Sequence, residues 1–259
     1  MTDKRIAAFA LSTIAVLGGC GGEASAPSPP PAETTSASAA SAAAAPARPG
    51  PDLAPERTAG EDYEVIAFHV ALDRARVTIA DVAMSTDLES VLAKTGGSLA
   101  FNAGFFEVDT LPEGLAVSEG RELSAKSLVL GGGVVAIAGR RARLFAVEEY
   151  APPEGLDFAV QCRPRLVVGG AQHVKKDDGR AAERTALCLR DGGARLDVVL
   201  ARGGLTLSAL SALLAARGCE GALNLDGGPS TGAAWREGGS IRSSPPREGI
   251  RHAIVVTLD

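Results

Sequence analysis

A short acidic, glycine-rich segment near the C-terminal end of the chain has the residue types best suited to chemistry. An apolar strand expected at 222–225 runs directly into Asp226, Gly227 and Gly228, followed by a proline and two hydroxyl residues. Because glycine has no Cβ, a ligand can approach the backbone N–H groups here closely, while the strand holds the carboxylate in place. An Asp-Gly pair is also a common hairpin signal, so a plain tight turn is the alternative interpretation.

Three further segments lie at the ends of expected apolar strands, at 102–106, 161–164 and 183–185. Each has a plain structural interpretation when it is taken alone. Gln161 can cap a neighbouring backbone, and Arg184 can be a surface residue at a strand edge. The order and spacing of all four segments are more informative than any one of them.

Together these segments resemble the phosphodiester glycosidase family, and the resemblance extends over roughly 65–258. The family patterns N-x-G-F-F, Q-x-x-P-x-L-V, R-T-A and N-L-D-G-G occur at 102–106, 161–167, 184–186 and 224–228. The resemblance implies an enzyme that hydrolyses a sugar-1-phosphodiester or a related glycoconjugate.

The chain departs from the family pattern at several positions. Arg163 stands where a glycine is frequent, Pro229 stands where a third glycine is frequent, and His252 stands where an asparagine is common. The family's arginine before the last strand is matched by either Arg247 or Arg251. These changes concern the identity of the substrate more than the fold.

Hydrolysis of a sugar phosphodiester expels a phosphate monoester, which is a good leaving group. The reaction therefore needs a cradle for an anion and a carboxylate beside the anomeric carbon more than it needs a strong general acid. Asp226 would supply the carboxylate, as nucleophile or as the base that activates water, and Glu107 is the second candidate. We expect backbone amides to keep Asp226 ionised and Arg184 to bind the phosphate. The residues expected to bind substrate are Asn102, Gly104, Gln161, Thr185, Gly227, Gly228, Ser230, Thr231, Arg247 and Arg251.

Two other functions remain open on the sequence. The chain can be a glycan- or phosphoglycan-binding lipoprotein that keeps the pocket without turnover, or a glycosidase that acts on a neutral glycosidic bond. Loss of Arg184 should matter little in the second case.

The cysteines, histidines and charge bound the cofactors and partners. Cys162, Cys188 and Cys219 have no metal-type or redox-type spacing, so one disulfide is possible, and its pairing is open. The three histidines are scattered, and we expect no metal and no cofactor. The net charge of −5 without a basic run argues against nucleic acid as a partner.

The N-terminal end is predicted to be a processing signal followed by a tether. Basic residues and a short apolar stretch at 1–19 end on Leu-Gly-Gly-Cys, which resembles a bacterial lipobox with Cys20 as the lipidated residue. The residue after Cys20 is Gly21 and not an aspartate. The resemblance to known lipoproteins then implies that the protein is located in the outer membrane of the cell envelope. The Ala-, Ser- and Pro-rich segment 20–61 is expected to be a disordered tether.

The remaining residues, 62–259, are predicted to form a single α+β domain. Most expected strands occur as hairpins, which indicates a mixed or mostly antiparallel sheet. Two main helices are predicted, one at 87–94 and one that begins after Thr206 and ends before Gly218.

Overall fold

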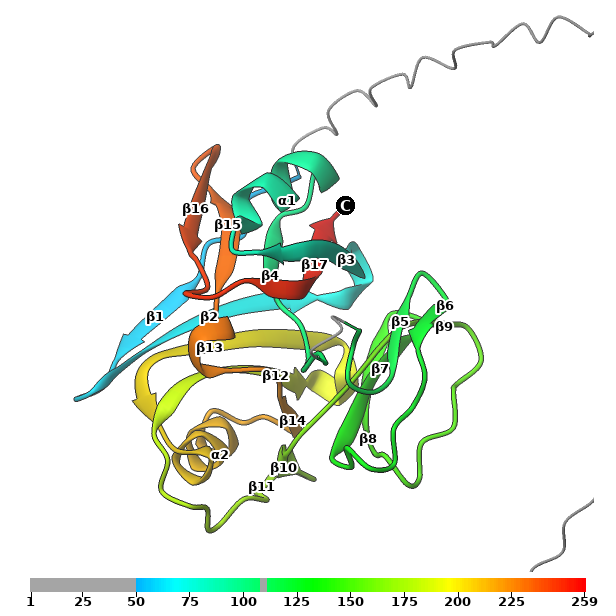
Figure 1. The fold of residues 1–259 in the computed structure, drawn as a ribbon, viewed down its shortest axis with the longest axis vertical. Coiled ribbons are helices and arrows are strands. Elements are labelled where there is room, and N and C mark those ends of the chain that lie inside the picture. The colour runs from blue at the N-terminus through cyan, green and yellow to red at the C-terminus, as the bar shows by residue number, and fades with distance from the viewer. Residues whose placement is uncertain (1–49, 108–110) are drawn as a thin grey trace, which may run out of the picture. The chain divides into compact units, whose positions relative to one another are not determined.

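The computed structural model describes residues 50–107 and 111–259 (Figure 1). The chain divides into two compact units, Met1–Ala43 and Ala44–Asp259, and every described residue belongs to the second unit. The predicted signal peptide, the predicted lipidation site at Cys20 and most of the predicted tether lie outside the described residues.

Three antiparallel sheets make up the described part of the second unit (Figure 1). The largest has seven strands in the order β1 (Glu56–Ala59), β2 (Tyr63–Ala71), β13 (Arg195–Leu205), β12 (Ala182–Arg190), β14 (Gly221–Asn224), β10 (Arg165–Val168) and β11 (Ala171–Gln172). A five-stranded sheet has the order β16 (Ser240–Ser244), β15 (Ala233–Glu237), β4 (Leu99–Asn102), β17 (Ile250–Leu258) and β3 (Ala75–Ser85). The other five-stranded sheet has the order β6 (Arg121–Ser124), β5 (Ala116–Ser118), β9 (Leu156–Cys162), β7 (Gly133–Ala138) and β8 (Arg141–Ala146).

The helices of the described residues are short and lie against the sheets. The α-helices are α1 (Leu88–Thr95) and α2 (Leu207–Ala216), and the 3₁₀ turns are η1 (Leu72–Arg74), η2 (Asp191–Gly193) and η3 (Gly228–Ser230). The side chain of Asp87 caps α1 and that of Thr206 caps α2, each by accepting a backbone N–H. Both helices therefore occur where the sequence predicts them.

The α+β fold class is nevertheless wrong. In the described residues 51% are in strands and 13% in helices, so the fold is mostly antiparallel β with three sheets. The longest strands, β3 and β13, have 11 residues each, whereas α1 has 8 and α2 has 10. Local patterns located the helices, but they did not show that the strands assemble into three separate sheets, because pairing depends on residues distant in sequence.

The inner strands of the large sheet bury both of their faces, whereas the edge strand β1 is exposed. In β2, Ile66 and Phe68 belong to the core that the three sheets share, whereas the alternate residues Val65 and Ala67 pack in the cluster that includes α2 residues. This division follows from the two-residue period of a strand. The shared core also contains Trp235, and the centroid of its ring lies 5.4 Å from the ring centroid of Phe68.

Described residues before the predicted domain boundary at residue 62 also contact the folded unit. Gly50 and Leu53 donate backbone hydrogen bonds of 2.8 Å to Gly96 and Arg236, and Leu53 packs against the shared core. Residues Glu56–Ala59 form β1, which pairs with β2. Residues 50–59 are thus part of the folded unit and not of a tether.

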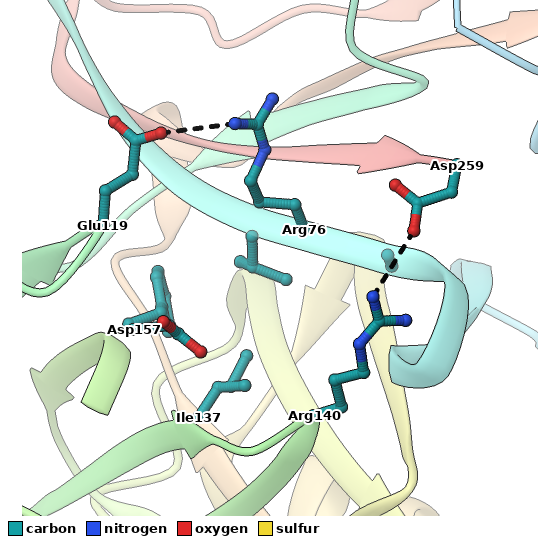
Figure 2. A pocket seen from close by; sticks show the side chains of 9 residues that line it. Arg76, Glu119, Ile137, Arg140, Asp157 and Asp259 are labelled. Carbon is teal, nitrogen blue, oxygen red and sulfur yellow. Dashed lines mark hydrogen bonds and ion pairs between the residues drawn. The ribbon is translucent and has the colours of Figure 1, made fainter. Parts of the chain in front are cut away.

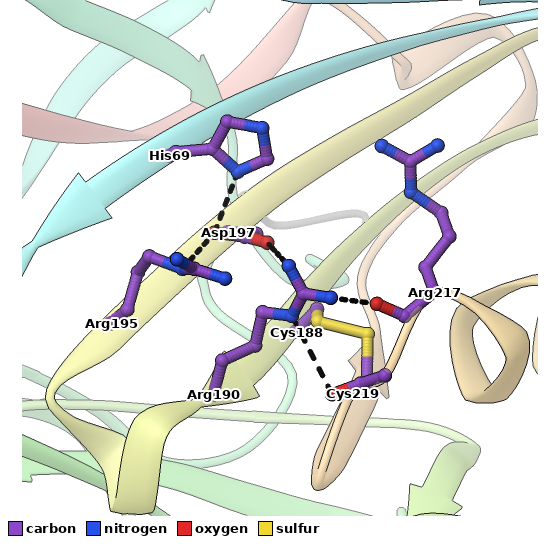
Figure 3. The surroundings of a disulfide bond; sticks show 8 residues. His69, Cys188, Arg190, Arg195, Asp197, Arg217 and Cys219 are labelled. Atoms are coloured by element: carbon purple, nitrogen blue, oxygen red, sulfur yellow. Dashed lines mark hydrogen bonds and ion pairs between the residues drawn. A yellow bond between two sulfur atoms is a disulfide. The ribbon is translucent and has the colours of Figure 1, made fainter.

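One disulfide joins Cys188 of β12 to Cys219, which lies two residues before the start of β14 (Figure 3). The third cysteine, Cys162, is free and fully buried, and burial raises the pKa of its thiol to about 12. Beside the disulfide, the buried carboxylate of Asp197 forms ion pairs with Arg190 and Arg195. The imidazole Nδ1 of His69 lies 2.9 Å from the same carboxylate.

Candidate active site

The large sheet brings two of the predicted segments together. β12 and β14 are antiparallel neighbours with Ala186 opposite Asn224, so the start of β12 meets the end of β14. The backbone N–H of Leu225 donates to the carbonyl of Thr185 over 2.8 Å, which continues the pairing past the strand end. Arg184 and Asp226 consequently leave neighbouring strands at the same edge.

Asn102 connects the second sheet to this edge. Its amide nitrogen donates to the backbone carbonyl of Asp226 over 2.7 Å, although the two residues are 124 positions apart. Its amide oxygen accepts hydrogen bonds from the Thr185 hydroxyl at 2.7 Å and from the Gly232 N–H at 3.2 Å. Asn102 and Thr185 are buried and do not face solvent. Asn102 therefore positions the backbone of Asp226 from the protein interior, and Thr185 orients Asn102.

Asp226 itself is mostly buried, and this changes the expected direction of its pKa. Burial raises the pKa of the carboxyl above its usual value, and hydrogen bonds from the Ser230 hydroxyl and the Gly227 N–H only partly offset that rise. The Gly227 N–H lies 2.8 Å from Oδ1. The sequence-based expectation of several amide donors is therefore corrected, because one N–H and one hydroxyl do not outweigh desolvation.

The two glycines after Asp226 are required by the backbone. A Cβ on Gly227 would lie 2.9 Å from the carbonyl oxygen of Glu183, and Gly228 has a φ of +61°. They allow η3 to follow the strand immediately, and η3 places the Ser230 hydroxyl back at Asp226. Thr231 is fully buried next to Thr185, with their hydroxyl oxygens 3.4 Å apart.

A cleft of about 510 Å³ opens in front of Asp226. Its cationic lining consists of Arg163, Arg180 and Arg184, and none of these three forms an ion pair with a described residue. The rest of the lining is Phe105, Pro164, Ala182, Leu207, Asn224, Leu225, Gly227, Gly228 and Pro229. One carboxylate and three unpaired guanidinium groups thus share a single cleft.

Arg184 is held rigidly in this lining. Its Nε donates to the carbonyl of Leu205 over 3.0 Å, and its Nη2 donates to the carbonyl of Arg180 over 2.8 Å. Since a guanidinium has five N–H donors, three remain for a ligand. Burial, followed by the charge of Arg180, lowers the pKa of Arg184 from its ordinary value.

Comparison with known proteins identifies the family to which this arrangement belongs. The family model described as phosphodiester glycosidase matches residues 95–257, which include every segment around the cleft. The chain belongs to the phosphodiester glycosidase family.

Solved structures share the fold of this phosphodiester glycosidase domain. A hypothetical protein from Synechocystis superposes with a TM-score of 0.58 at 14% identity, covering 79% of this chain and 61% of that protein. The chain therefore spans less than two thirds of that protein's length. The zebrafish N-acetylglucosamine-1-phosphodiester alpha-N-acetylglucosaminidase catalytic domain, auto-inhibited by its pro-peptide, superposes with a TM-score of 0.57 at 16% identity, covering 80% of this chain and 83% of that domain.

A protein from Burkholderia pseudomallei K96243 that is described as exported also shares the fold. It superposes with a TM-score of 0.53 at 13% identity, and the match covers 75% of this chain and 74% of that protein. At these identities the likeness shows the fold alone. No curated protein sequence matches the chain.

Several family-segment residues do not line the cleft. The amide group of Gln161 is fully engaged: its oxygen accepts from the N–H groups of Leu115 and Ser127, and its nitrogen donates to the carbonyls of Ser127 and Gly131. Gly104 lies against it, since a Cβ there would be 3.1 Å from the Gln161 carbonyl oxygen. Gln161 therefore holds backbone segments outside the cleft lining together, whereas Arg163 and Pro164 of the same segment line the cleft.

The second predicted carboxylate and the second predicted arginine also do not line the cleft. Glu107 is exposed and outside the cleft lining, and its N–H donates to the carbonyl of Leu111. Arg247 pairs with Glu183 at 3.4 Å, and Arg251 pairs with Asp81.

Arg163 and Arg180 take the place of those arginines at the cleft. Arg163 had one signal in the sequence, since it replaces a glycine that is frequent in the family. Arg180 lies in the connection between β11 and β12, which contains no motif, so nothing in the sequence marked it.

The described residues contain neither a cluster of metal-ligating side chains nor a membrane-spanning helix. Within 50–107 and 111–259, no group of three or more His, Cys, Asp or Glu side chains is arranged to hold a metal ion. No helix of the described part of the chain combines the length and the apolar character needed to cross a bilayer.

Proposed function

We propose that this chain is a glycosidase that hydrolyses the bond between the anomeric carbon of a sugar and a phosphodiester oxygen. The observation that carries the proposal is the cleft whose lining combines Asp226 with three arginines that form no ion pair with a described residue. A carboxylate suits the electron-poor anomeric carbon, and guanidinium groups suit the phosphate oxygens. Family membership supports the same reaction class.

The reaction follows from these positions. A water oxygen bonds to the anomeric carbon while the bond from that carbon to the phosphate oxygen breaks, and the electron pair leaves with the phosphate monoester. Asp226 takes the proton of the water, and its raised pKa makes it a stronger base than an exposed aspartate. The arginines stabilise the charge that develops on the departing phosphate.

The sugar would lie on the apolar part of the lining. Phe105 belongs to the predicted N-x-G-F-F segment, is partly buried against the shared core and lines the cleft. Its ring offers a surface on which the C–H face of a sugar can pack, with Leu207 and Pro229 in the same lining.

The experiment is incubation of the purified full chain with a panel of α- and β-linked sugar-1-phosphodiesters in water enriched in ¹⁸O. We expect free sugar that carries the label at its anomeric oxygen. A label on the phosphate would instead indicate a phosphodiesterase. Binding without turnover would support the non-catalytic glycan-binding function, and hydrolysis of neutral glycosides that survives Arg184→Ala would support the neutral glycosidase.

We also propose that the protein is exported and anchored through a lipid on Cys20 in the outer membrane of the cell envelope. The lipobox-like residues at 17–20 support export and lipidation, and Gly21 supports the outer membrane. The disulfide between Cys188 and Cys219 supports an oxidising compartment, because such bonds are rare in the cytosol.

A further inference from the structure

The charge of the cleft lining is larger than a phosphodiester requires. Its ionisable side chains are those of Arg163, Arg180, Arg184 and Asp226, so three positive charges face one negative charge. A phosphodiester carries a single negative charge at neutral pH. With Asp226 ionised, one positive charge of the lining would stay uncompensated.

Two acidic residues in the segment before β12 act on this lining from outside it. The charges of Asp178 and Asp177 act on Arg184, but neither carboxylate lines the cleft or forms an ion pair with a cleft arginine. The carboxylate of Asp177 is engaged at the N-terminal end of α2, where it accepts from the Ser208 N–H. The excess of the lining is therefore reduced by these two carboxylates but is not neutralised by ion pairs.

Two other arginines near the site form ion pairs with one carboxylate. Arg202 and Arg247 share Glu183 at 3.0 and 3.4 Å. The chain as a whole is negative, with a formal charge of −5. The cleft lining thus carries a local positive excess in an acidic protein.

A second hollow of the same size shows the contrast (Figure 2). It also measures about 510 Å³, but its arginines are paired, Arg76 with Glu119 at 3.4 Å and Arg140 with Asp259 at 3.8 Å. Asp157 adds a third carboxylate to its lining. Its charge balance is thus negative, whereas that of the Asp226 cleft is positive.

Two of the cleft arginines are held next to each other, and neither forms an ion pair with a described residue. The Nη2 of Arg184 donates to the backbone carbonyl of Arg180, which fixes the connection that carries Arg180 at the cleft. The charge of Arg180 also contributes to the lowered pKa of Arg184, which reflects repulsion between the two guanidinium groups. A ligand with two anionic groups would relieve that repulsion.

We propose that the preferred substrates are sugar-1-diphosphate esters, whose two ionised phosphates match the net charge of the cleft. This inference rests on the proposed function. The phosphate bonded to the sugar lies against Arg184 near Asp226, and the second phosphate lies against Arg180 and Arg163. Water adds to the anomeric carbon, the carbon–oxygen bond breaks, and a diphosphate monoester leaves with the electron pair while Asp226 takes the proton.

The cleft volume accommodates such a substrate. Sites for ligands of this size range from about 300 to 1,000 Å³, and 510 Å³ lies within that range. The exposed positions of Arg163 and Arg180 leave the ester group on the second phosphate free to extend into solvent. The inference therefore specifies the two phosphates and leaves that ester group unrestricted.

The test compares two substrates that differ in one phosphate. The full chain is assayed with the methyl esters of one sugar-1-phosphate and of the corresponding sugar-1-diphosphate. We expect kcat/KM to be at least tenfold higher for the diphosphate ester and to fall more steeply with salt. Arg180→Gln should reduce this preference to about twofold or less, mainly by slowing the diphosphate ester, and Arg76→Gln is the matched control outside the cleft.

Binding separates this inference from the proposed reaction. Calorimetry with the two phosphonate analogues in which CH₂ replaces the anomeric oxygen measures affinity without hydrolysis. If neither ester is hydrolysed but the diphosphate analogue binds tenfold more tightly in an Arg180-dependent way, the proposed function fails and the charge inference stands. Equal affinities for the two analogues, or an equal loss for both in Arg180→Gln, would overturn the inference.

Discussion

Asp226 has an environment that sets both its charge state and its geometry. Its carbonyl is held by Asn102, its carboxylate accepts from Gly227 and Ser230, and the cleft lies in front of it. Burial raises the pKa of the carboxyl, which favours the protonated form but also makes the ionised form a stronger base. Three predictions follow from this residue and from its neighbour Arg184.

Asp226→Asn should abolish catalysis without unfolding the protein. We expect turnover of the sugar phosphodiester to fall by roughly a hundredfold or more, the range for removing a positioned acid–base group. Because the buried carboxylate is costly when ionised, the free energy of unfolding at pH 7 should be unchanged or higher in the variant. A turnover assay measures the loss of activity, and chemical denaturation measures the free energy of unfolding. An unfolded variant would show that Asp226 is structural.

The pH dependence should report the raised pKa of Asp226. A base is active when ionised, so kcat/KM should fall on the acid side, with an apparent pKa above the ordinary value of 3.8. Stability should change in the opposite sense. The folded state binds more protons than the unfolded state above pH 3.8, so the contribution of this residue decreases as the pH rises through the folded pKa. An acid limb at or below 3.8 would contradict the assignment.

Arg184→Lys should separate the charge of this residue from its planar fork. Lysine keeps one positive charge but cannot donate at once to Leu205, to Arg180 and to a phosphate. We expect kcat/KM for phosphodiesters to fall about tenfold or more, with a smaller effect on neutral glycosides. Steady-state kinetics on both substrate types measure this, with Arg76→Lys as the control. Full activity in Arg184→Ala would remove the phosphate-binding role.

At the level of elements, the site depends on strand ends that belong to different sheets. β12 and β14 supply Arg184 and Asp226, β4 supplies Asn102, and the disulfide between Cys188 and Cys219 links β12 to the approach of β14. For a separation of 31 residues, such a bond stabilises by roughly 3–4 kcal/mol in the chain-entropy model. The two α-helices pack in clusters separate from the core that the three sheets share. Of their residues, Leu207 of α2 lines the cleft.

Truncation should show where the folded unit begins. A chain that begins at residue 50 should melt like the mature protein, whereas a chain that begins at residue 62 loses β1 and the Leu53 contact. Exposing the partly buried Leu53 and losing the hydrogen bonds between β1 and β2 together cost roughly 2 kcal/mol. That loss corresponds to a decrease in Tm of about 4–8 °C for a unit of this size. Equal Tm values for the two truncations would show that residues 50–61 do not stabilise the fold.

For the whole molecule, the proposed anchor decides where the cleft meets its substrate. Cys20→Ser should move the protein from the membrane to the soluble fraction or leave its leader uncleaved, because the thiol that carries the lipid is absent. Ser25→Ala in the same segment is the control. Membrane fractionation followed by immunoblotting measures the distribution. An unchanged distribution for Cys20→Ser would contradict lipid anchoring.

The sequence by itself determined the family, the positions of both helices and the acidic strand end at Asp226. These properties depend on local order: a strand followed by Asp-Gly-Gly, a cap followed by a leucine stripe, and motifs that recur in a set order. A local pattern does not depend on how distant strands pair, so these properties follow from the order of neighbouring residues alone.

Only the tertiary structure decided which charges meet at the cleft and how they are balanced. Arg163 and Arg180 converge there, whereas Arg247 and Arg251 are paired with acidic residues elsewhere. The direction of the Asp226 pKa, the choice of disulfide among three cysteines and the three-sheet architecture were decided in the same way. Burial, ion pairing and strand pairing depend on contacts across more than a hundred positions, such as that between Asn102 and Asp226, and no local pattern contains them.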